Sequence, residues 1–152
     1  MLPGITLRTT CLVGFPGETK DDFNCLLDFI NEIEFDHLGV FAFSEEEGTK
    51  AVALPRKVSG RLARRRRDIL MRAQRHIVAR KLAAAIGGIE EVLIEKAEKP
   101  ARRIWRARSR RQAPEVDNAV FLRDYAKECG PGMFVKARNV KASGYDLIAE
   151  PV

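Results

Sequence analysis

Apolar and polar positions in the first 85 residues predict two strands that alternate with two helices. Residues 5–15, ITLRTTCLVGF, are rich in β-branched and apolar side chains and indicate a buried strand. Thr19 is a suitable N-cap, and the apolar residues after it recur at helical spacing, which predicts an amphipathic helix to about residue 34. A second strand is predicted at 37–44 and a long helix at 60–85, an order that implies a parallel sheet. The inner stripe of the long helix is expected to comprise Leu62, Ile69, Ala73, Ile77 and Ala84.

After Gly88 the pattern changes to short segments of alternating polarity. Five of these segments are predicted as strands, at 90–97, 102–109, 118–122, 133–140 and 145–152. Five short strands in so few residues indicate a small antiparallel barrel of the OB type. We therefore expect an α/β domain at residues 1–86 and an all-β domain at residues 87–152, because glycines close the long helix between them.

Composition adds constraints on location and on metal binding. Hydrophobic residues make up 45% of the 152 residues, enough for a packed core. No stretch approaches the roughly 20 apolar residues of a membrane span, and the first residues do not resemble a signal peptide, so a cytoplasmic protein without membrane contact is expected. The three cysteines, Cys11, Cys25 and Cys129, lack the spacing of metal ligands, and no metal site is predicted. Cys11 and Cys25 are expected to be buried free thiols.

Positive charge is concentrated in one segment of the chain. Residues 61–85 carry 9 Lys or Arg against 1 acidic residue, whereas residues 1–60 carry 5 against 10. The run from Arg64 to Arg67 favours a polyanion such as RNA as a partner. The alternative is a solvated helix face, or one that pairs with the acidic first third of the chain. In ARRIWRARSRR, residues 101–111, arginines for phosphate contacts surround a tryptophan for base stacking; the alternative places Trp105 in the core.

The stretch VGFPGET, residues 13–19, joins the first strand to the first helix. Its glycines let a ligand approach the backbone closely, and the amides at the following helix start are exposed. In α/β barrels such strand-to-helix loops lie on the catalytic face. A turn that only connects two elements is the alternative interpretation.

Several segments together resemble one known family. LRTTCLVGFPGET and DDFNCLLDFINEIEFDHLGVFAFSEEEGTKA are similar to the later part of the radical-SAM barrel of the methylthiotransferases. The end of the chain, from RARSRRQAPEVDNAVFL to YDLIAEPV, resembles their C-terminal TRAM domain. FSEEEGT and APEVDNAV resemble the RimO-type branch more than its tRNA-modifying MiaB-type relative. The resemblance implies the last two strand–helix units of a TIM-like radical-SAM barrel, followed by a five-stranded OB-like TRAM barrel.

The resemblance also implies an activity. RimO-type enzymes add a methylthio group to an aspartate of ribosomal protein S-twelve in the small ribosomal subunit, with S-adenosylmethionine and two 4Fe-4S clusters held by cysteines. One cysteine set has the spacing CxxxCxxC, and this sequence carries neither set, so we expect a C-terminal fragment that is inactive alone. Two alternatives stay open. The first is a non-catalytic TRAM module that binds RNA or the ribosome, and the second is a tRNA methylthiotransferase of the MiaB type.

Site residues follow from the same resemblance, none of them catalytic. Contacts to S-adenosylmethionine are expected from Arg8, Thr10, Val13, Gly14, Gly17, Phe43 and Ser44. Contacts to the substrate are expected from Thr49, Trp105, Arg106, Arg108 and Tyr145. Glu18 is expected to be either a ligand-facing acid or part of the helix cap. A partial barrel leaves an open sheet edge and an uncovered apolar face, so residues 1–58 are expected to be unstable alone or to pair with a second chain.

Overall fold

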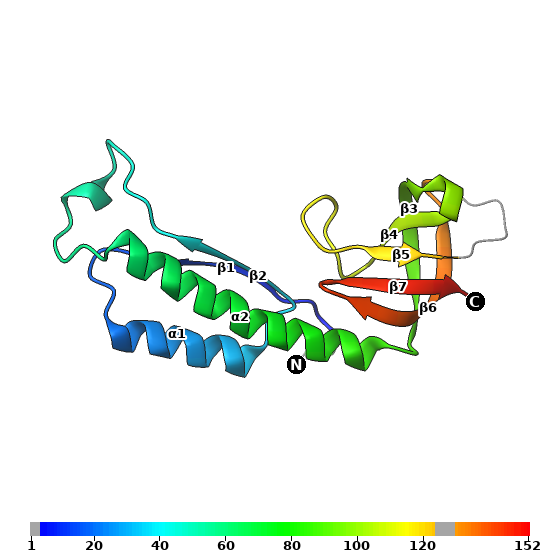
Figure 1. The fold of residues 1–152 in the computed structure, drawn as a ribbon, viewed down its shortest axis with the longest axis horizontal. Coiled ribbons are helices and arrows are strands. Elements are labelled where there is room, and N and C mark those ends of the chain that lie inside the picture. Colours follow the sequence, from blue (N-terminus) through cyan, green and yellow to red (C-terminus); the bar gives the residue numbers. More distant parts are fainter. Residues whose placement is uncertain (1–3, 124–129) are drawn as a thin grey trace. The chain divides into compact units, whose positions relative to one another are not determined.

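The computed structural model describes residues 4–123 and 130–152. In chain order, the elements are β1 (Arg8–Val13), α1 (Lys20–Ile33), β2 (His37–Ala42), the 3-10 helix η1 (Lys50–Ala53), α2 (Gly60–Ala85), β3 (Ile89–Lys99), the 3-10 helix η2 (Pro100–Arg102), β4 (Ile104–Ser109), β5 (Val120–Leu122), β6 (Phe134–Ser143) and β7 (Asp146–Pro151) (Figure 1). They divide into two compact units, Met1–Ile77 and Val78–Val152. No helix in the described ranges combines the length and the apolar character that crossing a membrane requires.

The first unit contains the predicted strand–helix–strand arrangement. β1 and β2 pair in parallel, from Arg8 opposite His37 to Val13 opposite Ala42. α1 connects them and ends where Glu34 adopts a left-handed backbone with φ 55°. One face of this small sheet packs with the helices around a core of Val13, Phe23, Ile30, Phe35, Leu38, Val40, Leu70 and Ile77. The parallel pairing is confirmed, whereas membership of a larger radical-SAM barrel stays a prediction.

The long helix α2 begins and ends as predicted, and its predicted inner stripe is right only in part: Ile77 is buried in the core and Ile69 packs against that core. The buried positions are Ala63, Arg66, Leu70, Gln74, Ile77 and Val78. Leu62 and Ala84 are exposed instead. The real stripe admits two polar side chains because each has bonding partners; the Gln74 amide, for example, donates to the Phe35 carbonyl at 2.8 Å. Because the prediction considered only apolar residues, it placed the buried face of α2 at a different angle around the helix axis.

In the second unit, five strands form a closed ring in the order β3-β4-β5-β7-β6, with β6 pairing back to β3. Four of the pairings are antiparallel, and β5 with β7 is parallel. The prediction of five strands is confirmed, and the prediction that they are all antiparallel is wrong. The reason is geometric: strand direction cannot alternate all the way round a ring of five strands, so one pair must be parallel.

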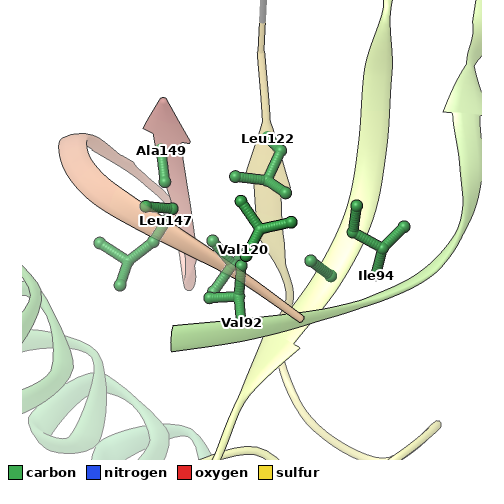
Figure 2. Packing of buried hydrophobic residues seen from close by; sticks show 9 residues of the cluster. Val92, Ile94, Val120, Leu122, Leu147 and Ala149 are labelled. Carbon is green, nitrogen blue, oxygen red and sulfur yellow. The ribbon is translucent and has the colours of Figure 1, made fainter. Parts of the chain in front are cut away.

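Inward side chains fill this ring. Figure 2 shows Val92, Ile94, Val120, Leu122, Leu147 and Ala149 turned toward one another; Ala107, Val135 and Ala137 complete the buried cluster. β3 pairs with both β4 and β6, and its register to β4 shifts twice, between Ile94 and Lys96 and between Ala97 and Lys99. Such shifts bend and twist a strand, which suits β3 to a closed ring.

Candidate functional site

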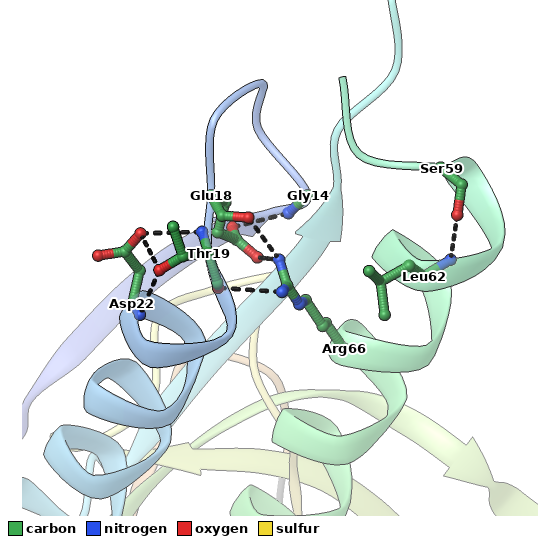
Figure 3. Close-up of polar contacts among 7 residues, drawn as sticks. All are labelled: Gly14, Glu18, Thr19, Asp22, Ser59, Leu62 and Arg66. Atoms are coloured by element: carbon green, nitrogen blue, oxygen red, sulfur yellow. Dashed lines mark hydrogen bonds and ion pairs between the residues drawn. The ribbon is translucent and has the colours of Figure 1, made fainter. Parts of the chain in front are cut away.

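The turn between β1 and α1, residues 14–19, is here called the glycine turn, and a helix cap ends it (Figure 3). The Asp22 N–H donates to Thr19 Oγ1 at 3.1 Å, and the Thr19 N–H donates to the Asp22 carboxylate at 2.9 Å. This reciprocal capping box satisfies two amides that a helix start leaves without partners. The predicted N-cap at Thr19 is confirmed.

The cap makes the stability of the first unit depend on pH. Hydrogen bonds from the side chain and backbone of Thr19 lower the pKa of Asp22 below its ordinary value. Because the carboxylate form is favoured in the folded state, its contribution is present above about pH 4–5 and is lost as the pH falls through the folded-state pKa. The free energy of unfolding of the unsubstituted chain should therefore exceed that of Asp22→Ala at pH 7, and the difference should shrink toward pH 3. Urea unfolding at a series of pH values measures it, and a difference independent of pH would contradict the assignment.

Glu18 bridges the glycine turn to α2. Its Oε2 accepts the Gly14 N–H at 2.8 Å, while its Oε1 pairs with the Arg66 guanidinium (Figure 3). The Glu18 side chain is only 12% exposed, so the carboxylate faces these partners rather than solvent. Of the two roles expected for Glu18, the helix cap is performed by Thr19 and Asp22 instead.

Arg66 is buried at 6% exposure and makes several contacts with the glycine turn. Its guanidinium also donates to the carbonyl oxygens of Glu18 at 3.3 Å and Thr19 at 2.9 Å, and it lies over the Phe23 ring, 5.3 Å from the centroid. Arg66 thus pairs with the acidic first third of the chain, as the alternative interpretation predicted. The three flanking arginines differ: Arg64 and Arg65 are exposed, and Arg67 pairs with its neighbour Asp68 at 2.8 Å.

Close packing explains the first glycine of the turn. Gly14 has φ 82°, and a Cβ atom built on it would lie 2.3 Å from Ala63 Cβ of α2. Gly17 has φ 91°, and its N–H donates to the Arg56 carbonyl at 2.9 Å. The side-chain space that Gly14 leaves open is therefore taken by Ala63. Contact of either glycine with a cofactor stays a prediction.

The other residues predicted to bind the cofactor do not share one environment. Arg8 and Thr10 are exposed on the outer face of β1, whereas Val13 is fully buried in the core. Phe43 is half-buried and packs edge to face on Phe15, with ring centroids 5.2 Å apart. The alternation of a strand explains the separation of Val13 from Arg8 and Thr10, because successive side chains point to opposite faces.

The loop after β2 holds two further predicted residues close together. The exposed Ser44 hydroxyl donates to the Glu46 carboxylate at 3.2 Å, and the exposed Thr49 hydroxyl donates to the Glu46 carbonyl at 2.8 Å. Ser44 was predicted as a cofactor residue and Thr49 as a substrate residue. Both side chains thus bond within one loop around Glu46.

The outer face of β1 and β2 is apolar toward the turn. Leu12 and Phe41 are a cross-strand pair and are 50% and 62% exposed. Thr10 pairs with Gly39 two residues earlier on each strand, and so on the same face. An exposed Leu–Phe pair of this kind is typical of a surface that another segment or ligand covers.

The cysteines differ in access. Cys11 is half-buried, while Cys25 is exposed on α1, so the prediction that Cys25 is buried is wrong; Cys129 lies outside the described residues. α1 presents only a narrow inner stripe, and Cys25 lies off it between the buried Phe23 and Ile30. In residues 4–123 and 130–152, no three His, Cys, Asp or Glu side chains are arranged to hold a metal ion.

Thiol labelling should follow this difference in access. Burial raises the pKa of Cys11 and so lowers its thiolate fraction. With iodoacetamide at pH 8, the peptide containing Cys25 should be modified several-fold faster than the peptide containing Cys11, as measured by mass spectrometry. In urea the two rates should converge. Equal rates in the folded chain would contradict the described burial.

In the second unit, the predicted substrate residues of β4 divide between two faces. Trp105 is half-buried and packs against the barrel core, as the alternative interpretation of its segment predicted. Arg106 and Arg108 lie on the outer face and share one partner, Glu95 of β3, at 3.7 Å and 3.0 Å. Tyr145 is exposed in the turn between β6 and β7. The structure therefore does not bring these four side chains to one surface.

Sequence reasoning missed the part that Arg66 plays. It grouped Arg66 with its neighbours as one charged run, although a signal was available. Ala63, Arg66, Leu70, Gln74 and Ile77 follow the spacing of three and four residues that marks one helix face. A charged residue at such a position implies a buried partner of opposite charge. The acidic residue that directly follows the glycines of the turn is Glu18.

The chain is similar to known proteins over almost its whole length and in its second unit. Residues 86–152 match the family model of the TRAM domain. The chain is similar to ribosomal protein uS12 methylthiotransferase RimO of Trichlorobacter lovleyi, with 41% identity over 99% of this chain and 33% of that protein. The corresponding protein of Koribacter versatilis is 41% identical over 98% of this chain and 30% of its own length, and that of Synechococcus sp. is 46% identical over 98% and 32%. The chain spans about a third of the length of the curated relatives that it matches. Residues 86–152 therefore form a TRAM domain, and the chain as a whole is similar to part of the RimO-type methylthiotransferases.

Proposed function

We propose that the chain works as part of a radical-SAM methylthiotransferase that modifies an aspartate of ribosomal protein uS12. The observation that carries this proposal is the identity of 41–46% over almost the whole chain to proteins with that name. Because the chain spans about a third of those relatives, we propose that it acts together with the remaining portion of such an enzyme. A cytoplasmic location and a domain boundary at residues 86/87 belong to the same proposal.

Within this proposal, the outer face of β1 and β2 lies toward S-adenosylmethionine. Arg8 and Thr10 offer an exposed guanidinium and hydroxyl there, beside the side-chain-free Gly39. Leu12 and Phe41 add apolar surface for an adenosyl group. These residue types fit the cofactor, which when bound would supply the methyl group and the radical. We assign no ligand of an iron–sulfur cluster to the described residues.

A chimera tests the proposal. In a strain without its own uS12 methylthiotransferase, the corresponding third of a relative is replaced by this chain, and uS12 is examined by mass spectrometry. We expect the chimera to restore the methylthio group on the aspartate, and this chain expressed alone to leave uS12 unmodified. A folded chimera that leaves uS12 unmodified would overturn the proposal, whereas methylthiolated tRNA instead would favour the MiaB-type alternative.

RNA or ribosome binding by the TRAM domain is a second candidate function. The observation that favours it is the positive charge on the outer faces of β4 and β6, which carry Arg106, Arg108, Lys136 and Arg138. Basic surfaces of this kind attract polyanions, and their affinity falls as salt rises. This function is compatible with the first, since a domain that holds ribosomal RNA would bring an enzyme to its ribosomal substrate.

A further inference from the structure

The outer face of β6 combines an aromatic side chain with two cations. Phe134, Lys136 and Arg138 alternate with buried Val135, Ala137 and Asn139, so the first three point outward along one line. Phe134 is 67% exposed. An aromatic ring exposed in this way offers a flat apolar face on which a base can stack.

The strand that carries this face is hydrogen-bonded along both edges. β6 pairs with β3 on one side and β7 on the other, within the closed ring. Across to β3, Leu93 lies opposite Phe134 and Glu91 lies opposite Lys136. Phe134 therefore stands at an apolar end of the face, and the cations follow at intervals of two residues.

The comparable surface of β4 is less suited to a polyanion. Trp105 packs against the barrel core, and Arg106 and Arg108 share the carboxylate of Glu95. By contrast, Lys136 and Arg138 form no ion pair within the described part of the chain, although Glu91 and Glu150 stand opposite them on the neighbouring strands. An unpaired cation gains more from a phosphate than one that must first leave a carboxylate.

We propose that the outer face of β6 is a binding site for single-stranded RNA. Phe134 stacks on one unpaired base, and Lys136 and Arg138 contact the phosphates that follow. Single-stranded RNA fits because a free base face is needed for stacking on an aromatic side chain, and a duplex hides it. The proposal deepens and rests on the second candidate function, and it places the contacts on β6 rather than on the arginines of β4.

Fluorescence anisotropy with the whole chain and a labelled single-stranded RNA of about ten nucleotides tests this site. Phe134→Ala should weaken binding by about 5- to 100-fold, while Phe134→Trp should retain it. Phe29→Ala is the matched control, because Phe29 is an aromatic side chain of the other unit, 47% exposed, and its loss should leave affinity unchanged. Lys136→Ala with Arg138→Ala should reduce the slope of log affinity against log salt by about 1.4.

The outcomes separate the two proposals. If the unsubstituted chain binds no RNA at low salt, both the RNA-binding function and this site are overturned. If it binds RNA, and Arg106→Ala with Arg108→Ala abolishes binding while Phe134→Ala does not, only the site on β6 is wrong. Loss with Phe134→Ala at an unchanged melting temperature, together with retention in Phe134→Trp, supports the site.

Discussion

Arg66→Met should destabilise the first unit by about 3–5 kcal/mol, because it leaves the buried Glu18 carboxylate without its cation. Methionine keeps much of the arginine volume, so the cost comes from the charge and the lost hydrogen bonds to the Glu18 and Thr19 carbonyl oxygens. Hydrogen exchange of α1 peptides under increasing urea measures this loss. It reports the first unit specifically, whereas the single tryptophan, Trp105, reports the second.

The chain offers a control one residue away. Arg67 pairs with Asp68 at the surface, where the two side chains are 41% and 57% exposed, so Arg67→Met should cost at most about 1 kcal/mol. Glu18→Gln combined with Arg66→Met should recover part of the loss, since no buried charge is then left alone. Equal effects of Arg66→Met and Arg67→Met would show that the Glu18–Arg66 pair does not stabilise the glycine turn.

Gly14→Ala should destabilise the same unit by about 2–5 kcal/mol. A left-handed backbone costs alanine about 1–2 kcal/mol, and overpacking against Ala63 adds about 1–3 kcal/mol. The added Cβ would lie 2.3 Å from Ala63 Cβ and 3.0 Å from Ala63 Cα, so the helix itself would have to move. The measurement is the free energy of unfolding, again from exchange in α1 peptides.

Gly48 separates the two contributions. Its φ of 81° nearly equals that of Gly14, but nothing lies within 4 Å of an added Cβ. Gly48→Ala should therefore show the backbone cost alone. Gly14→Ala with Ala63→Gly should regain part of the packing loss. If Gly14→Ala and Gly48→Ala cost the same, close approach of α2 is not what requires glycine at position 14.

Much of the fold could be predicted because local signals agree with it. The limits of α2 and the N-cap at Thr19 follow from residues near each helix end. Strand edges were less accurate: the first strand was predicted at residues 5–15 and is Arg8–Val13. Pairing decides where a strand ends, and the partner strand is remote in sequence. The parallel pair β5–β7 was missed for a related reason. Whether the first and last strands of a sheet pair to close a ring depends on all the strands together, and the pattern within one strand does not show it.

The candidate site was harder to predict than the fold. VGFPGET was correctly located as a strand-to-helix turn. Its glycines were predicted to make room for a ligand, but the neighbour of Gly14 is Ala63, which lies 49 positions further along the chain. Trp105 and Arg106 were grouped by adjacency although β4 turns them to opposite faces. Periodicity assigns faces, but it does not say which face a distant element will cover.

The ring of five strands has a consequence for the order in which it is assembled. β3 with β4 and β6 with β7 are neighbours in sequence, and the second pair is joined by a short turn in which Gly144 has φ 64°. Both hairpins can form early because their loops are short. β5–β7 aligns only three residue pairs, from Val120 opposite Leu147 to Leu122 opposite Ala149. Because so few pairs hold it, this parallel pairing should be among the first in the ring to open in native-state fluctuations.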